Sequence, residues 1–255
     1  MKNIINSLKY IMMSAVIFSL TSCEDYLSPD PTAAISSETF YQTQEDFDLA
    51  VINMYDAIAG LNSTNSNDNH SLQVEFYLTE MRSDNTRTKA QEGEAAQFEF
   101  FTIESTNGII DDYYRSFYDV IFRANSILDN LGNIQNSAAY EAEAKFVRAY
   151  AYFNLVRLYG DIPLVNRGIE ITDTSTQFTR VATSSIYDLI HSDSNTAILG
   201  LDNSYKTRAS KAAAQPLLAK VYLTLGVNYL EAQILCEAVM TSGFLLEPDF
   251  KDVFY

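Results

Sequence analysis

The chain has 255 residues, of which 47% are hydrophobic and 13% aromatic, so it is long enough to bury a sizeable core. Acidic residues outnumber basic ones by 33 to 17, and the formal net charge of −16 speaks against nucleic acid or an anionic membrane surface as a partner. The low number of turn-forming residues, 9 Gly and 5 Pro, favours a helical fold over a β-sandwich built on tight turns.

The start of the chain has the pattern of a lipoprotein signal peptide. An apolar run over residues 10–20 follows a basic stretch, and it is too short to span a bilayer but suits a secretory signal. The sequence LTSC over residues 20–23 resembles the bacterial lipobox, in which the cysteine is acylated. We therefore expect a signal peptide over residues 1–22 and a lipidated tether over residues 23–35, with Cys23 as the lipidation site. The alternative is an ordinary signal peptide with a chance cysteine.

Helical patterns dominate the rest of the chain. Thr43 and Asp46 have the spacing of a capping box, and an apolar helical face follows them and ends at Gly60. Residues 62–69 are too rich in Asn and Ser to pack, and residues 72–81 are expected to form a short helix.

Two segments after this helix lack a helical period. Residues 82–93 are polar, which predicts a long surface loop. Phe98 and Phe100 alternate with polar residues, which favours a short strand over residues 97–103.

Five further helices are predicted, the first two and the last two as antiparallel pairs that faintly resemble tetratricopeptide repeats. They cover residues 111–131, 137–159, 184–200, 211–225 and 228–242. Short extended pieces are expected over residues 162–165 and 169–171. Pro216 either lies in the first turn of its helix, which then begins near residue 215, or kinks that helix.

The helix predicted over residues 137–159 has no polar face of ordinary width. Between Phe146 and Tyr159 only Arg148, Asn154 and Arg157 are strongly polar, and the two arginines point to opposite sides. Such a helix should be buried on nearly all sides. We expect at least one of its arginines to be buried and paired with carboxylates or carbonyls.

Motifs for catalysis or metal binding are missing. There is no nucleotide loop, no zinc-binding motif, no nucleophile motif and only two histidines, so no metal, cofactor or catalytic residue is expected. The carboxylate pairs Asp111-Asp112 and Glu92/Glu94 would suit a glycosidase. Charge at a helix start and solvation of a loop explain them better. Cys236 lies in a helical pattern and is expected to be a buried, inert thiol.

The residues best suited to ligand binding gather around the loop over residues 82–93. They combine planar or charged groups that hydrogen-bond sugar hydroxyls with aromatic rings that can take the flat C–H face of a sugar. The polar candidates are Arg82, Asp84, Asn85 and Arg87, and the aromatic candidates are Tyr77, Phe98 and Phe101. The alternative is a solvated loop beside core aromatics.

Several motifs together resemble those of the SusD/RagB family of nutrient-binding outer-membrane lipoproteins. The block from Arg148 to Pro163 is the most specific part of the resemblance. The motifs are the lipobox, SETFY over residues 37–41, Ser83-Asp84-Asn85, Tyr114-x-x-x-Tyr118-x-x-Ile121-x-x-x-Asn125, residues 144–163, and residues 210–223.

The resemblance implies an all-α fold of tetratricopeptide-like antiparallel helix pairs, with irregular loops and little strand. It also implies a protein without enzymatic activity that is lipid-anchored in the outer membrane. Such a protein hands oligosaccharides, or peptides in some members, to a SusC-like TonB-dependent transporter. Glu24 and Asp25, directly after the lipobox, resemble the signal that sends some lipoproteins to the cell exterior.

The chain departs from the family pattern in three ways. Family members are usually twice as long, so residues 36–255 are expected to be an N-terminal helical domain with the C-terminal half of the family fold absent. There is no Trp, and Tyr114 stands where the family often has one. Pro216 is unusual in its helix. The alternative function is therefore a non-enzymatic protein-interaction scaffold that does not bind ligand.

Overall fold

The computed structural model describes residues 40–59, 71–89, 93–135, 137–169, 173–176, 178–204 and 207–254. The described helices and strands all lie in the unit Tyr41–Tyr255. Its α-helices are α4 (Gln44–Ala59), α5 (Ser71–Thr79), α6 (Glu94–Glu99), α7 (Gly108–Asn130), α8 (Ala138–Tyr159), α9 (Thr183–Gly200), α10 (Lys211–Leu225) and α11 (Tyr229–Met240). Short 3-10 helices are η1 (Glu80–Arg82), η2 (Leu131–Asn133) and η3 (Phe250–Phe254), and the strands are β1 (Ile162–Pro163) and β2 (Arg180–Val181).

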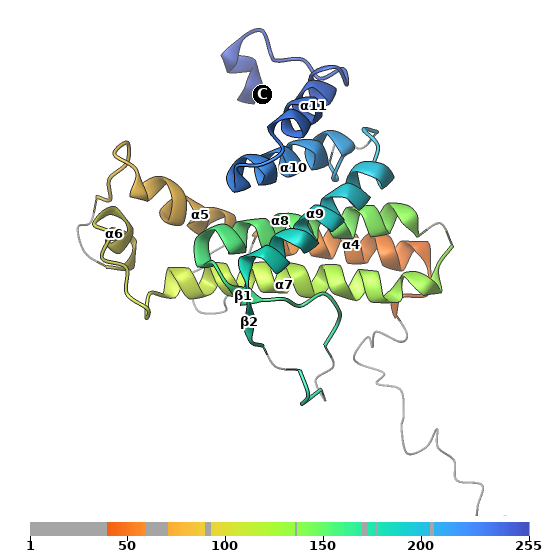
Figure 1. The fold of residues 1–255 in the computed structure, drawn as a ribbon, viewed down its shortest axis with the longest axis horizontal. Coiled ribbons are helices and arrows are strands. Elements are labelled where there is room, and N and C mark those ends of the chain that lie inside the picture. The colour runs from red at the N-terminus through yellow and green to blue at the C-terminus, as the bar shows by residue number, and fades with distance from the viewer. Residues whose placement is uncertain are drawn as a thin grey trace, which may run out of the picture. The chain divides into compact units, whose positions relative to one another are not determined.

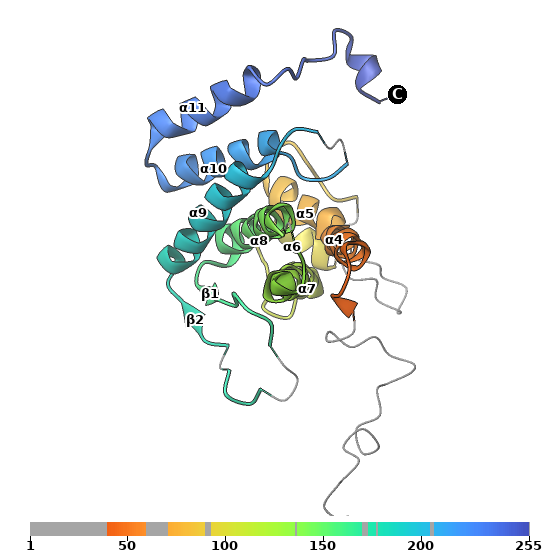
Figure 2. The ribbon, with the colours of Figure 1, turned by 90° about the vertical axis from the view of Figure 1, so that its right-hand side faces the viewer.

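Antiparallel helix pairs make up most of this unit, which confirms the predicted all-α class. Helix α7 packs against α8, α8 against α9, and α10 against α11, while α4 packs alongside α7 and α8 (Figures 1 and 2). The two strands form one short antiparallel ladder, in which Ile162 faces Val181. None of the helices in the described part is long and apolar enough to cross a membrane.

Helix α4 begins with the predicted capping box. The Thr43 amide donates to Asp46 Oδ2 at 2.8 Å, and the Asp46 amide donates to Thr43 Oγ1 at 3.2 Å. These reciprocal bonds satisfy amides that have no partner within the first turn of a helix. The predicted stop at Gly60 and the polar loop over residues 62–69 lie outside the described residues.

Helix α7 begins earlier than expected. Asn107 is its N-cap, because the Asn107 side chain accepts a hydrogen bond from the Ile109 amide at 3.0 Å. Asp111 and Asp112 therefore lie in the first turns of the helix, where both pair with Arg115, at 3.0 Å and 3.6 Å. The two negative charges lie near the positive, N-terminal end of the helix dipole, as predicted, but Asp111 is not the first residue of α7.

Helix α8 is buried on nearly all sides, as predicted, because α4, α7, α9 and α10 all pack against it. The helix ends at Gly160, whose positive φ of 71° suits glycine. Its buried residues are Ala142, Glu143, Ala144, Val147, Arg148, Ala149, Ala151, Tyr152, Phe153, Asn154, Leu155 and Val156.

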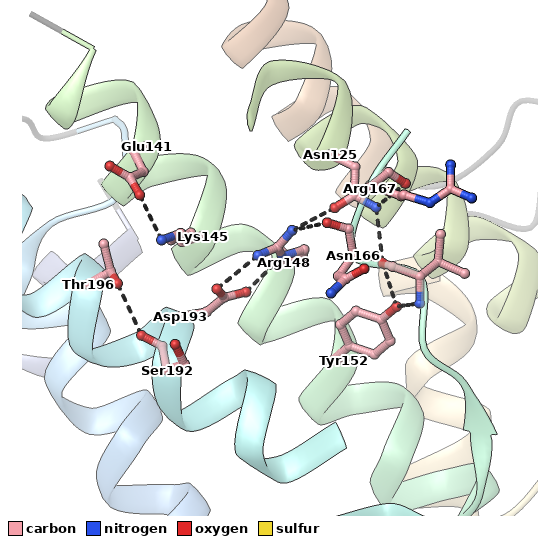
Figure 3. A network of polar contacts seen from close by, with 11 residues as sticks. Asn125, Glu141, Lys145, Arg148, Tyr152, Asn166, Arg167, Ser192, Asp193 and Thr196 are labelled. Carbon is pink, nitrogen blue, oxygen red and sulfur yellow. Dashed lines mark hydrogen bonds and ion pairs between the residues drawn. The ribbon is translucent and has the colours of Figure 1, made fainter. Parts of the chain in front are cut away.

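Arg148 is the buried arginine that the sequence led us to expect. Its Nε and Nη2 donate to the two carboxylate oxygens of Asp193 on α9, at 2.7 and 2.9 Å. Its Nη1 donates to Asn125 Oδ1 on α7 at 2.7 Å and to the Asn166 carbonyl at 3.2 Å (Figure 3). Arg148 thus joins three helices and the segment after β1. Arg157, by contrast, is exposed and stacks over the Phe153 ring at 4.3 Å.

The chain after β1 is held against α7 and α8 by side chains. The Tyr118 hydroxyl donates to the Pro163 carbonyl at 2.7 Å, and the Tyr152 hydroxyl donates to the Val165 carbonyl at 2.8 Å. Asn125 Nδ2 also donates to the Val165 carbonyl, at 3.0 Å. The extended piece predicted over residues 162–165 contains β1, which is shorter than predicted.

Helix α10 and strand β2 differ from what the sequence pattern indicated. Helix α10 begins at Lys211, capped by Ser210, so Pro216 lies inside it and the alternative of a helix start near residue 215 is wrong. The extended piece predicted over residues 169–171 falls partly on residues outside the description, and β1 instead pairs with residues 180–181, which the sequence pattern did not reveal.

The strand predicted over residues 97–103 is wrong. The chain there forms α6 and a turn, in which the Phe100 amide donates to the Ala96 carbonyl at 3.1 Å. Phe98 is buried but Phe100 is 47% exposed, so the alternation of these two residues does not mark one buried face. Cys236 was expected to be buried, but it is exposed on α11.

Candidate ligand-binding loop

The loop after η1 is fixed at both ends. At its start, the Ser83 amide and the Thr86 hydroxyl both donate to the Glu80 carbonyl, at 2.9 and 2.5 Å. Towards its end, the Thr88 amide and hydroxyl both donate to Glu99 Oε2 on α6, at 2.7 and 3.0 Å. The loop between these points is therefore presented on a defined backbone, although it has no regular secondary structure.

The turn after α6 is also held by hydrogen bonds, in which the buried Asn107 takes part. Gln97 Oε1 accepts from the Glu104 amide at 3.1 Å and from Asn107 Nδ2 at 2.8 Å. The Thr102 amide donates to the Gln97 carbonyl at 2.9 Å. These bonds close a compact turn over residues 100–107 and fix the direction of Phe101.

Phe101 has a strained and exposed conformation. Its φ is +56°, a left-handed value that β-carbon sterics disfavour for a phenylalanine. The residue is 65% exposed, and the Arg82 guanidinium lies over its ring, 5.7 Å from Cζ to the ring centroid. Residues held in such backbone regions cluster at ligand sites, where the surrounding structure offsets a strain of about 1–3 kcal/mol.

The polar candidates are all on the surface. Asp84 and Asn85 form the turn directly after Ser83, and in the described part of the chain their side chains make no hydrogen bond or ion pair. Arg87 is 85% exposed and only reaches Glu99 at 4.0 Å. Asp84 lies two residues after Arg82, so the two Cα atoms are within about 7 Å of each other. The carboxylate and the amide are thus exposed on the loop that directly follows Arg82.

The aromatic candidates separate into different environments. Phe98 is only 1% exposed, so its ring belongs to the core and not to a ligand surface in this structure. Tyr77 on α5 is half-buried and contacts Phe76, with ring centroids 6.2 Å apart. Phe76 and Phe100 are exposed, at 46% and 47%, and the sequence pattern did not single them out as ligand residues. In the sequence, Phe76 and Phe100 could have been found only because each lies next to a predicted ligand residue, Tyr77 or Phe101.

The arrangement offers groups that can bind a polar ligand. It offers an exposed aromatic ring, a stacked guanidinium, a carboxylate and an amide, which are the groups that orient a polyhydroxylated ligand. Among the described residues no group of three or more His, Cys, Asp or Glu side chains could hold a metal ion.

A comparison with known protein families now identifies the chain. Residues 25–223 match the SusD-like family model that is described as "Starch-binding associating with outer membrane". This match covers well over half of the chain. The chain belongs to the SusD-like family.

Individual SusD-like proteins support the same assignment. SusD-like protein P25 of Formosa agariphila is 31% identical over 233 residues, which are 86% of this chain and 42% of the relative. SusD-like protein P2 of the same organism is 28% identical over 253 residues, 96% of this chain and 49% of the relative. The solved structure of a laminarin-binding SusD-like protein matches with a TM-score of 0.70 at 25% identity, over 84% of this chain and 48% of that one. The chain thus spans about half the length of the curated relatives it matches.

Proposed function

We propose that this SusD-like protein binds nutrient oligosaccharides at the loop site formed by Arg82, Asp84, Asn85 and Phe101. The observation that carries the proposal is the exposed, strained Phe101 ring under Arg82. The Asp84 carboxylate and the Asn85 amide, on the loop that follows Arg82, are exposed and have no partner in the described part. The relative that is named for laminarin binding supports a glycan as the ligand class. A peptide ligand is the alternative within the same site.

The chemistry of the site fits a sugar ring. The C–H face of a pyranose would lie on the exposed side of Phe101, and its hydroxyls would donate to Asp84 and accept from Asn85. Burial of a full phenylalanine side chain stabilises by about 1.5–3 kcal/mol, so the one face available here would contribute somewhat less. Two hydrogen bonds of about 1 kcal/mol each would add orientation as well as affinity.

We propose further that the protein acts from the outer membrane and without catalysis. Acylation at Cys23 would anchor it there, and it would deliver the bound glycan to a SusC-like TonB-dependent transporter at the cell exterior. The Asp111-Asp112 pair, the clearest candidate for a hydrolytic pair in the described part, is engaged with Arg115 on the surface of α7. That engagement supports a binding role over a glycosidase role.

Calorimetric titration of the chain without its signal peptide and Cys23 tests the site. The ligands are oligosaccharides of laminarin, starch and xyloglucan. Phe101→Ala should weaken binding about tenfold, which corresponds to about 1.4 kcal/mol. Phe178→Ala is the matched control, because Phe178 is equally exposed, at 63%, on a different segment.

Two results would argue against the proposal. If Phe101→Ala and Phe178→Ala bind the same glycan as tightly as the parent, the loop is a solvated surface. If the folded parent binds none of the oligosaccharides or peptides offered, the protein-interaction scaffold becomes the better account of this chain.

A further inference from the structure

The loop over residues 82–89 carries positive charge in a protein that is acidic overall. It holds three basic residues, Arg82, Arg87 and Lys89, and one acidic residue, Asp84, and all four are exposed. The whole chain has 17 basic and 33 acidic residues. The excess of basic residues in this loop therefore runs against the composition of the chain.

The basic residues of the loop also differ from most others in their pairing. Neither Arg82 nor Lys89 forms an ion pair with the described residues, and Arg87 Nε comes no closer than 4.0 Å to Glu99 Oε1. Seven basic residues elsewhere in the described part have a carboxylate oxygen within 3.0 Å, namely Arg115, Arg123, Lys145, Arg148, Arg167, Arg208 and Lys251. The cations of the loop can therefore pair with a ligand without breaking a short ion pair first.

The loop gathers its positive charges at the end of α6. Arg82 Cζ lies 5.7 Å from the centroid of the Phe101 ring, and Arg87 Nε lies near the Glu99 carboxylate. Thr88 donates to the same carboxylate through its amide and its hydroxyl, so the last basic residue of the loop follows an anchored position. The cations are thus held around residues 99–101, where the Phe101 ring is 65% exposed.

The carboxylates beside the loop are used in two ways. Glu94 and Glu99 accept hydrogen bonds from backbone amides, at 2.8 and 2.7 Å, and so support the local backbone. Glu80 and Asp84 are exposed. Guanidinium and ammonium groups next to exposed carboxylates suit a ligand that carries hydroxyls as well as anionic groups, because the hydroxyls can donate to the carboxylates.

An acidic protein can bind an anion only where local charge outweighs the charge of the rest. Interactions between exposed charges are screened over about 8 Å at physiological ionic strength. Acidic residues on distant helices therefore have little influence on a ligand that touches the loop, whereas the three cations of the loop act on it at short range.

We infer that the loop site takes an anionic oligosaccharide, with uronate or sulfate groups, in preference to a neutral one. This inference rests on the glycan binding proposed above and names the class of glycan. Arg82 and Arg87 would donate to the anionic groups, since planar guanidinium groups match carboxylate and sulfate oxygens, and Lys89 would add a flexible positive charge. Hydroxyls of the same ligand would donate to Asp84, and a C–H face would lie on Phe101.

Pairs of glycans that differ only in charge test the inference. The probes are trigalacturonate against its methyl ester, and a sulfated galactan oligosaccharide against its desulfated form, each titrated by calorimetry. We expect the charged member of at least one pair to bind about tenfold more tightly, because several exposed charge pairs act together. This preference should shrink when NaCl is raised from about 50 mM to about 500 mM, because salt screens exposed charges.

Two double variants locate the charge that matters. Arg87→Gln/Lys89→Gln should reduce the preference for the charged glycan to about threefold or less. Arg167→Gln/Lys251→Gln is the matched control, since it also removes one arginine and one lysine, whose side chains are 57% and 70% exposed on other segments. The control should keep the preference of the parent, and both variants should melt close to the parent temperature because exposed substitutions cost little.

Three results would overturn the inference. If the neutral glycans bind as tightly as the charged ones, the inference is wrong and glycan binding at the loop still stands. If the two double variants lower the preference equally, the net charge of the protein sets it and not the loop. If the folded parent binds an acidic peptide but none of the glycans, the inference fails together with the proposed function.

Discussion

Replacement of Arg148 by methionine should destabilise the protein strongly. Arg148 is 5% exposed and Asp193 is 1% exposed, and the two are joined by bonds of 2.7 and 2.9 Å. The methionine side chain would fill much of the volume but would leave the Asp193 carboxylate buried without its partner. Removal of one member of a buried pair costs about 3–5 kcal/mol. With an m-value of about 1–3 kcal/mol per molar urea, the midpoint should fall by roughly 1–5 M.

The loss should depend on pH. Burial raises the pKa of Asp193 above its usual value, and the Arg148 guanidinium opposes that shift. In Arg148→Met the burial still raises this pKa and the largest opposing contribution is gone, so the folded-state pKa of Asp193 should rise further. A carboxyl whose folded pKa is raised favours the folded state at low pH and disfavours it as pH rises through that pKa. The deficit relative to the parent should therefore be smaller at about pH 5 than at about pH 8.

Urea unfolding followed by circular dichroism, at both pH values, measures this effect. The double variant Arg148→Met/Asp193→Leu is the control, because replacing both partners by apolar groups should recover most of the lost stability. Glycan binding by the folded fraction should be unchanged. A single variant within about 0.5 kcal/mol of the parent would refute the reasoning, because that is the range of exposed substitutions.

Three further predictions concern other parts of the chain. Asp84→Ala/Asn85→Ala should weaken glycan binding by about 1–3 kcal/mol in calorimetry with little change in melting temperature, since neither side chain has a partner in the described part; unchanged affinity would remove them from the site. Gly200→Ala should lower the free energy of unfolding by about 1–3 kcal/mol, because a Cβ there would lie 2.6 Å from Ala142 Cβ. The control Gly132→Ala should be nearly neutral, since a Cβ at that position has nothing within 4 Å. Equal effects of the two substitutions would contradict tight packing of α8 on α9. Cys23→Ala should take up no labelled palmitate and should leave the membrane fraction; a variant that stays labelled would exclude the lipobox.

Long periodic segments allowed the sequence to predict much of the helical fold. The bounds of α8 were predicted within one residue, because its apolar residues surround the whole helix and Gly160 and Pro163 end it. The burial of Arg148 followed from the same pattern, since no polar face was wide enough to expose both arginines. Its partner Asp193 could not be predicted, because the pairing depends on how α9 packs across α8.

Short segments and exposed faces were harder to predict. One turn of helix in α6 buries Ala96 and Phe98 with the same spacing as a strand, so local periodicity could not separate the two. Cys236 was expected to be buried because α11 is apolar, but burial depends on which elements cover a helix as well as on its composition. Within the loop site, the residue types indicated binding. The left-handed backbone at Phe101 and the burial of Phe98 needed the folded structure.

The most direct test of glycan binding is a crystal structure of the chain with a bound laminarin or starch oligosaccharide. We predict a sugar ring with its C–H face on Phe101, next to the Arg82 guanidinium, and with hydroxyls hydrogen-bonded to Asp84 and Asn85. A sugar bound elsewhere on the molecule, with the Phe101 ring uncovered, would contradict the proposed site.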